Sequence, residues 1–376
     1  LPTLIIAAYL VSKIPQLLEP SGRAYTLIER AITQPWILWE YVLNLIIPRT
    51  TVNSPFFDDH TALHTVLDSY FYLSITVWCA ILFFAYRLKD SHSFAFFGLL
   101  FFLAGHLLES SILNLELFFP HRNYVPAFGL YFVMACLVVS VQANFKRMLM
   151  AGTALYLLIN GLLVWSVTTL WGTPPLAAEM WAIHKESSPR AQHFLAAIKL
   201  EEGDKETAQR FLSRIAAKTD RSAMYSIQSF MLCQFAEHEK AAQLDQVLQS
   251  IKTARHENGL GLTLELLVET IVAGGCPMLS GADVERIIAA VLLNPDLSAD
   301  KNTQASIANS RAKLAYARDD ITRAIEYGWQ AYKISRNLDM GLAVVAQLAS
   351  NLDFGNSITR LEELREDAPS HLVRGY

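Results

Sequence analysis

Two kinds of hydrophobic patterning divide the chain close to residue 172. Up to that point apolar residues form long, nearly unbroken runs, whereas from about residue 176 they recur at the three- and four-residue spacing of amphipathic helices. A helix needs about 20 mostly apolar residues to cross a bilayer. The pattern predicts an all-α protein with a polytopic transmembrane helix bundle, residues 1–172, followed by a soluble helical domain, residues 176–376. The predicted spans are residues 2–19, 69–87, 93–109, 127–145 and 149–171.

A further apolar stretch, "ERAITQPWILWEYVLNLIIPR" (residues 29–49), starts and ends with charged residues and carries Pro35 near its start. Trp36 and Trp39 are typical of the headgroup level, so we interpret the stretch as an interfacial or re-entrant helix. A sixth span is the alternative. The chain begins at Leu1 without the basic start or small-residue cleavage site of a secretory signal peptide. We therefore expect it to be the carboxy-terminal part of a longer protein.

Basic residues give the expected orientation of the spans. Arg87 and Lys89 lie in the short loop between the second and third predicted spans, and Lys146 and Arg147 lie in the loop between the last two. Short loops rich in Lys and Arg stay on the cytoplasmic side, so we place both loops there. The segments then expected on the opposite, extracytoplasmic side are 20–68, 110–126 and everything after residue 172.

Two passages of the soluble half resemble the second helix of a tetratricopeptide repeat. "GDKETAQRFLSRI" and "DDITRAIEYGWQAY" carry small and apolar residues at the spacing of that helix, and their separation is close to a multiple of the roughly 34-residue period. The residues that carry the pattern are Gly203, Ala208, Leu212, Ile215, Ala324, Gly328 and Ala331. We predict a solenoid of helical hairpins whose extended surface holds a protein partner, with an irregular helical domain as the alternative.

The composition narrows the remaining choices. With a formal net charge of −4 over 376 residues, the chain offers no excess of basic groups for nucleic acid. Cys79 and Cys136 lie in apolar runs, where a free Cys behaves as a small hydrophobe. Cys233 and Cys276 lie in the soluble half and could pair if that half is extracytoplasmic.

The charged stretch "ESSILNLELFFPHRNYVPAFG", residues 109–129, separates two strongly apolar runs. Charges beside a bilayer are costly unless they pair or take part in function. Glu109 and Glu116 are two helical turns apart and can share one face if the segment stays helical. Pro120 is expected to break that helix, and Pro126 to begin the next element. The sequence thus predicts a polar elbow at the membrane surface.

Between the two prolines lie His121, Arg122 and Tyr124, which suit an anionic headgroup. Arg supplies a planar fork of donors for phosphate oxygens, His adds a donor, and Tyr can hydrogen-bond to a sugar or stack on it. The alternative is that Arg122 forms a salt bridge with Glu116 or Glu109 and only fixes the loop.

Two passages resemble a known family, the transmembrane, tetratricopeptide-repeat O-mannosyltransferases and their bacterial relatives, which include pilin-glycosylating transferases. The first is "ERAITQPWILWEYVLNLIIPR". The second, "ESSILNLELFFPHRNYVPAFGL", is similar to the family pattern "HRnYlPs-G", with Ala127 in place of the usual serine. The order of a membrane region followed by helical repeats is also similar.

The resemblance implies a GT-C-type glycosyltransferase that takes a sugar from a polyprenyl-phosphate carrier and passes it to a protein hydroxyl. It implies that His121, Arg122 and Tyr124 face the donor phosphate, and we add Glu109 and Glu116 as further binding candidates. It also implies an acidic general base in a loop upstream of this chain, so no carboxylate here is assigned that role. No organic cofactor is expected.

A second cluster, "SPFFDDHTALHTVLD", is expected on the same side of the membrane. Asp58 and Asp59 are candidates for substrate binding, because a divalent cation bridging an aspartate and the donor phosphate is chemically sensible. His60 and His64 are four residues apart and would lie side by side on a helix. No set of metal ligands is assigned, and the alternative is a polar loop in which an Asp caps the next helix.

We therefore expect a multi-pass protein of the bacterial inner membrane that glycosylates a protein, with pilins as one class of acceptor. Its partners would be the bilayer, the polyprenyl-phosphate sugar and an acceptor protein held by the helical repeats in the periplasm. Two alternatives are a polymerase or ligase of lipid-linked glycans, and a non-catalytic membrane-anchored scaffold.

Overall fold

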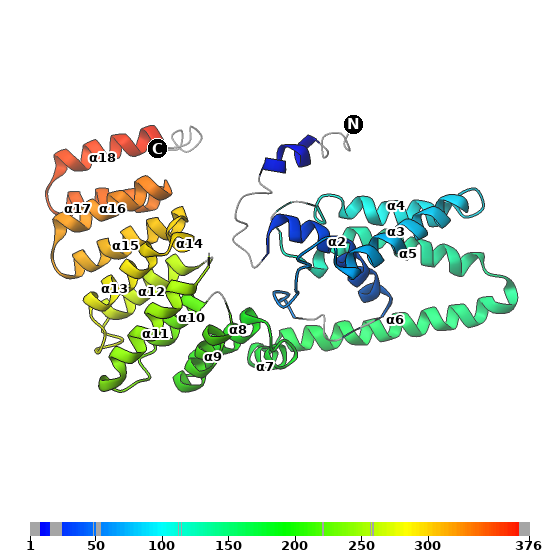
Figure 1. Cartoon of the computed structure of the whole chain (residues 1–376), viewed down its shortest axis with the longest axis horizontal. Coiled ribbons are helices and arrows are strands. Elements are labelled where there is room, and N and C mark those ends of the chain that lie inside the picture. Colours follow the sequence, from blue (N-terminus) through cyan, green and yellow to red (C-terminus); the bar gives the residue numbers. More distant parts are fainter. Residues whose placement is uncertain are drawn as a thin grey trace. The chain divides into compact units, whose positions relative to one another are not determined.

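The structure is a computed structural model that describes residues 8–15, 25–47, 49, 54–111, 113, 115–219, 222–255, 257 and 259–367 (Figure 1). Throughout these residues the regular elements are helices and no β-strand occurs, which confirms the all-α prediction. The chain divides into two compact units, Leu1–Phe194 and Leu195–Tyr376. The division falls beyond the predicted change at residues 172–176, because loops of the first unit bind Lys185, Ser188 and Arg190.

Within the described residues, three helices are long and apolar enough to cross a membrane: Ser69–Arg87, Pro120–Ser140 and Asn144–Trp171. α3 (Ser69–Arg87) matches the predicted span at both ends, and Asp68 caps it by accepting a hydrogen bond from the Tyr70 amide. α4 (Ser93–His106) is apolar but has only 14 residues, so it is shorter than the predicted span. Most of the span predicted at residues 2–19 lies outside the described residues.

The prediction for the last two spans, 127–145 and 149–171, was wrong about where the chain turns. α5 (Tyr124–Ser140) ends at Ser140, and α6 (Ala143–Trp171) starts after Val141 and Gln142. Lys146 and Arg147 therefore lie within α6, near its start, and not in a loop. Val141 turns the chain with an extended backbone, φ −71° and ψ 143°. No Gly or Pro marks this turn in the sequence, so the pattern of apolar residues did not reveal where the first of the two helices ends.

The stretch at 29–49 forms α2 (Leu27–Ile46), whose start is fixed by a capping box between Thr26 and Glu29. α2 packs on α3, where the Trp39 and Trp78 rings stack with centroids 4.5 Å apart. The helix itself is thus confirmed, and its interfacial placement stays a prediction.

α4 and α5 cross at two glycines. A Cβ on Gly98 would lie 2.4 Å from the carbonyl oxygen of Gly129, and a Cβ on Gly129 would lie 2.3 Å from the carbonyl oxygen of Gly98. Only Gly permits such an approach of two backbones. α6 is a single long helix (Figure 1). The apolar stretch that makes it a candidate span has no buried residue.

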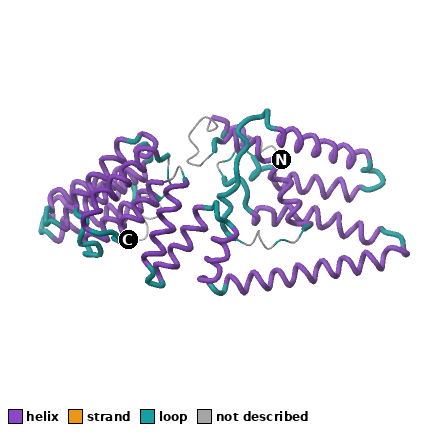
Figure 2. Tube along the Cα trace, turned by 60° about the horizontal axis from the view of Figure 1, so that its bottom comes forward, coloured by secondary structure: helices purple, strands orange, loops and turns teal. Residues whose placement is uncertain are grey.

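The helices that follow α6 account for most of the remaining chain (Figure 2). They are α7 (Pro174–His184), α8 (Pro189–Glu201), α9 (Lys205–Lys218), α10 (Ser222–Met231), η4 (Glu237–Glu239), α11 (Lys240–Thr253), α12 (Leu260–Val272), α13 (Gly281–Leu293), α14 (Pro295–Ser298), α15 (Lys301–Ala317), α16 (Ile321–Ser335), α17 (Leu338–Ser350) and α18 (Phe354–Asp367).

In the second unit most consecutive helices pack on one another. Helices further apart in sequence also pack: α10 contacts α12, α11 contacts α13, and α12 contacts α15. The two repeat-like passages form α9 and α16, each of which packs on a neighbour in the chain. At Gly328 a Cβ would lie 2.7 Å from the Val344 side chain, so this small residue does let α16 and α17 approach closely.

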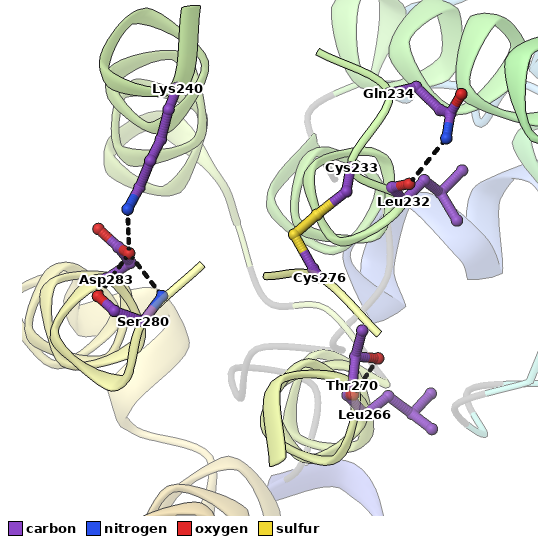
Figure 3. Close-up of a disulfide and its surroundings, with 9 residues drawn as sticks. All are labelled: Leu232, Cys233, Gln234, Lys240, Leu266, Thr270, Cys276, Ser280 and Asp283. Atoms are coloured by element: carbon purple, nitrogen blue, oxygen red, sulfur yellow. Dashed lines mark hydrogen bonds and ion pairs between the residues drawn. A yellow bond between two sulfur atoms is a disulfide. The ribbon is translucent and has the colours of Figure 1, made fainter. Parts of the chain in front are cut away.

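A disulfide joins Cys233, just after α10, to Cys276, in the loop before α13 (Figure 3). Their Cα atoms are 5.9 Å apart and 43 positions separate them in sequence. Cys276 is buried in the main hydrophobic core of the second unit. The pairing that the sequence left open is therefore present.

Candidate functional site

The elbow between α4 and α5 is not helical. From Leu107 to Phe119 the described residues form turns and irregular backbone, so the helix on which Glu109 and Glu116 could share one face is not present. A short 3-10 turn, η3 (Pro120–Asn123), leads directly into α5, and Pro126 lies inside the first turn of that helix rather than before it.

The elbow is held by a row of polar side chains on α2. Arg30, which is fully buried, donates from its guanidinium to the backbone carbonyls of Glu109, Ser111 and Leu115. Carbonyls that accept from a guanidinium do not need a helical partner, which explains why this segment can be buried without regular structure.

Further along the same row, Gln34 donates to the Leu117 carbonyl at 3.1 Å. The Tyr41 hydroxyl donates to the Phe119 carbonyl and accepts from the Phe119 amide. Sequence reasoning missed these residues. The spacing of these residues in the sequence could have identified them. Arg30, Gln34 and Tyr41 recur at helical intervals, on the face of α2 that also buries Leu27 and Ile37.

The guanidinium of Arg122 binds groups within the elbow itself. Its Nη1 donates to the Glu116 carbonyl at 2.6 Å, and its Nε lies 3.6 Å from Oε2 of Glu109. The Glu116 carboxylate binds the guanidinium of Arg190 at 2.6 Å. Arg122 therefore makes the contacts of the loop-fixing alternative, and its side chain is only 10% exposed.

Asp58 and Asp59 bind the connection between α7 and α8. Asp58 accepts from the Ser188 hydroxyl and from the Arg190 amide, so it caps α8, a helix distant in sequence. Asp59 forms a salt bridge with Lys185 at 2.9 Å. Burial alone would raise the pKa of Asp59, but hydrogen bonds from His60 and Lys185 outweigh it and lower the pKa to about 2.

The two histidines of this loop do not lie side by side, because residues 60–65 are not helical. His60 Nε2 lies 2.8 Å from Glu40, whereas His64 Nδ1 lies 2.7 Å from Glu29. Burial opposes the charged form of His60, yet hydrogen bonds to Asp59 and Glu40 raise its pKa to about 9. Among the described residues no group of three or more His, Cys, Asp or Glu side chains could hold a metal ion.

A cavity of about 940 Å³ lies in the first unit, between the end of α2, the start of α5 and the second half of α6. His121 and Tyr124 line it, and Tyr124 is 85% exposed. The other polar side chains in its wall are Tyr41, Asn44, Arg49, Asn123, Asn160 and Thr168, together with Tyr131. Of the predicted site residues, the structure therefore brings only His121 and Tyr124 to this cavity.

A second cavity, of about 750 Å³, lies in the second unit among α12, α15, α16 and α17. Its floor is made of small and apolar residues, among them Ala312, Ala343 and Val344. Lys313 sits in its wall and forms salt bridges with Glu265 at 3.0 Å and Glu269 at 2.7 Å.

No protein-family model matches the chain, and neither a curated protein nor a solved structure matches it.

Proposed function

We propose that the chain belongs to an integral membrane glycosyltransferase that moves a sugar from a polyprenyl-phosphate donor to a protein hydroxyl. The observation that carries the proposal is the cavity between α2, α5 and α6, in which His121 and Tyr124 face apolar side chains of two candidate spans. A lipid-phosphate sugar has an ionic head and a hydrocarbon tail, and a site for it needs both kinds of wall beside the bilayer.

In the proposed reaction the acceptor hydroxyl oxygen attacks the anomeric carbon of the sugar, and the carbon–oxygen bond to the phosphate breaks. The phosphate leaves with the electron pair, and the hydroxyl proton passes to a general base, a role that we assign to no residue of this chain. His121 donates a hydrogen bond to the phosphate, because a positioned donor stabilises the negative charge that develops there as the bond breaks. Tyr124 contacts the sugar. We give Asp58 and Asp59 no metal role, because their oxygens bind Ser188, Arg190 and Lys185.

We assign the second unit to holding the acceptor protein, with its helices acting as tetratricopeptide-like hairpins. The stacking of α10, α12 and α15 supports this, since solenoid repeats commonly present such a surface to a partner. The Cys233–Cys276 disulfide supports the periplasmic side of a bacterial inner membrane, because disulfides persist in oxidising compartments.

The test is intact-mass analysis of extracytoplasmic proteins, pilins first, from cells with and without the full-length gene. The expected result is the loss of a sugar-sized mass from one protein in the deletion strain, restored by the wild type but not by a His121→Ala form. His92→Ala is the matched control, since His92 is exposed and lies away from the cavity.

Unchanged protein masses, with altered surface-glycan length, would replace this proposal with a polymerase or ligase of lipid-linked glycans. If His121→Ala restores every phenotype of the deletion, the cavity has no catalytic part and a scaffold is the better account.

A further inference from the structure

The basic side chain that binds the donor phosphate can be chosen from the charges around the cavity. Two basic side chains, Arg49 and His121, are found among the described residues of its wall. Arg122 is absent from that wall, because its guanidinium faces Glu109 and the Glu116 carbonyl. We infer that Arg49 is the phosphate-binding cation and that Arg122 is a positioning residue that holds the elbow; this inference rests on the proposed function.

The residues that the structure describes around Arg49 do not balance its charge. Its side chain is exposed, and no described residue forms a salt bridge or hydrogen bond with it. Among the described residues that line the cavity, none is an Asp or Glu. An anion from outside the chain can therefore bind this guanidinium without displacing an existing partner.

The segment before α5 brings a second basic side chain to the cavity. Pro120, His121 and Tyr124 come from η3 and the first turn of α5, and all three line the cavity. The Tyr124 amide already donates to the His121 carbonyl, so this segment contributes the His121 ring and not a free helix amide. The guanidinium of Arg49 and the imidazole of His121 thus line the same cavity.

The rest of the wall indicates that the anion is attached to a lipid. Phe128 and Val125 on α5, and Val164 and Leu163 on α6, line the same cavity. Phe128 is 57% exposed and Val164 is 62% exposed, and both belong to candidate spans. A free phosphate would gain nothing from these side chains, whereas a polyprenyl chain would bury them. We therefore commit to a lipid-linked phosphate.

The experiment measures binding of a short-chain polyprenyl phosphate, and of the matching polyprenol, to the full-length protein in detergent by native mass spectrometry. The wild type should prefer the phosphate. Arg49→Ala should lower affinity for the phosphate by about ten- to a hundredfold, as expected for lost hydrogen bonds to a charged group, and leave the polyprenol unchanged. Arg87→Ala, which removes an exposed arginine from the end of α3, is the matched control.

The outcomes separate the two ideas. If the wild type does not distinguish phosphate from alcohol, the proposed donor chemistry fails and the role of Arg49 fails with it. If the wild type distinguishes them and Arg49→Ala binds the phosphate equally well, the role of Arg49 is wrong and the proposed function stands. If inorganic phosphate at the same concentration competes as well as the lipid, the assignment of a lipid-linked ligand is overturned.

Discussion

Replacing Arg30 by Met should loosen the elbow without removing apolar volume from α2. Arg30 is fully buried and donates to the carbonyls of Glu109, Ser111 and Leu115. A hydrogen bond from a charged donor contributes about 1.5–3 kcal/mol net. Because neighbouring bonds are not additive, we take about 3 kcal/mol for the whole set as a lower value. That corresponds to roughly a hundredfold increase in the open population of the elbow.

Hydrogen exchange measures this opening locally. The amide of Ser110 donates to His106 and the amide of Phe119 donates to the Tyr41 hydroxyl, so both report on the elbow. In Arg30→Met both should exchange about a hundredfold faster, whereas the exposed Arg87→Met change should leave them unaltered. Wild-type exchange rates at both amides in Arg30→Met would refute the role we give to the Arg30 hydrogen bonds.

Three further predictions concern other parts of the chain. The pKa of His60 is raised from 6.5 to about 9 in the folded state. Its protonation therefore stabilises the fold fully below pH 6.5, and this contribution disappears as pH rises through 9. His60→Gln should make the melting temperature less dependent on pH over that range. Gly98→Ala places a Cβ 2.4 Å from a backbone carbonyl and should destabilise by about 1–3 kcal/mol. Gly152→Ala is the control and should not destabilise the protein, because a Cβ there meets no atom within 4 Å. Thermal unfolding of both variants in the same detergent measures the difference. Cys233→Ser should lower the stability of the second unit by about 2–4 kcal/mol in denaturant unfolding, and an equal loss in wild type under reducing conditions checks the cause.

Apolar run length predicted α3 to the residue, because Asp68 and Arg87 mark its two ends in the sequence itself. It misplaced the turn between α5 and α6, where Val141 and Gln142 are no stronger a stop signal than their neighbours. Local signals decide such boundaries, and where the chain carries none, tertiary structure decides instead.

The candidate site was harder to predict, because long-range contacts decide which charges remain available. Arg122 looked accessible in sequence, but Glu109 and the Glu116 carbonyl occupy its guanidinium. Arg49 is the last residue of the first quoted passage, and no local pattern predicts that it lines the same cavity as His121. The motif predicted a phosphate-binding site, and the fold shows which basic side chains line the cavity.

The hydrogen bonds and salt bridges made by the α7–α8 connection limit how far its length can change. Lys185, Ser188 and Arg190 each contact a different group on the loops of the first unit: Asp59, Asp58 and Glu116. One residue inserted into this short non-helical connection would shift Lys185, Ser188 and Arg190 relative to one another, so that the three could not all reach their partners. Surface connections usually accept insertions, but this one should tolerate substitution far better than any change in the number of its residues.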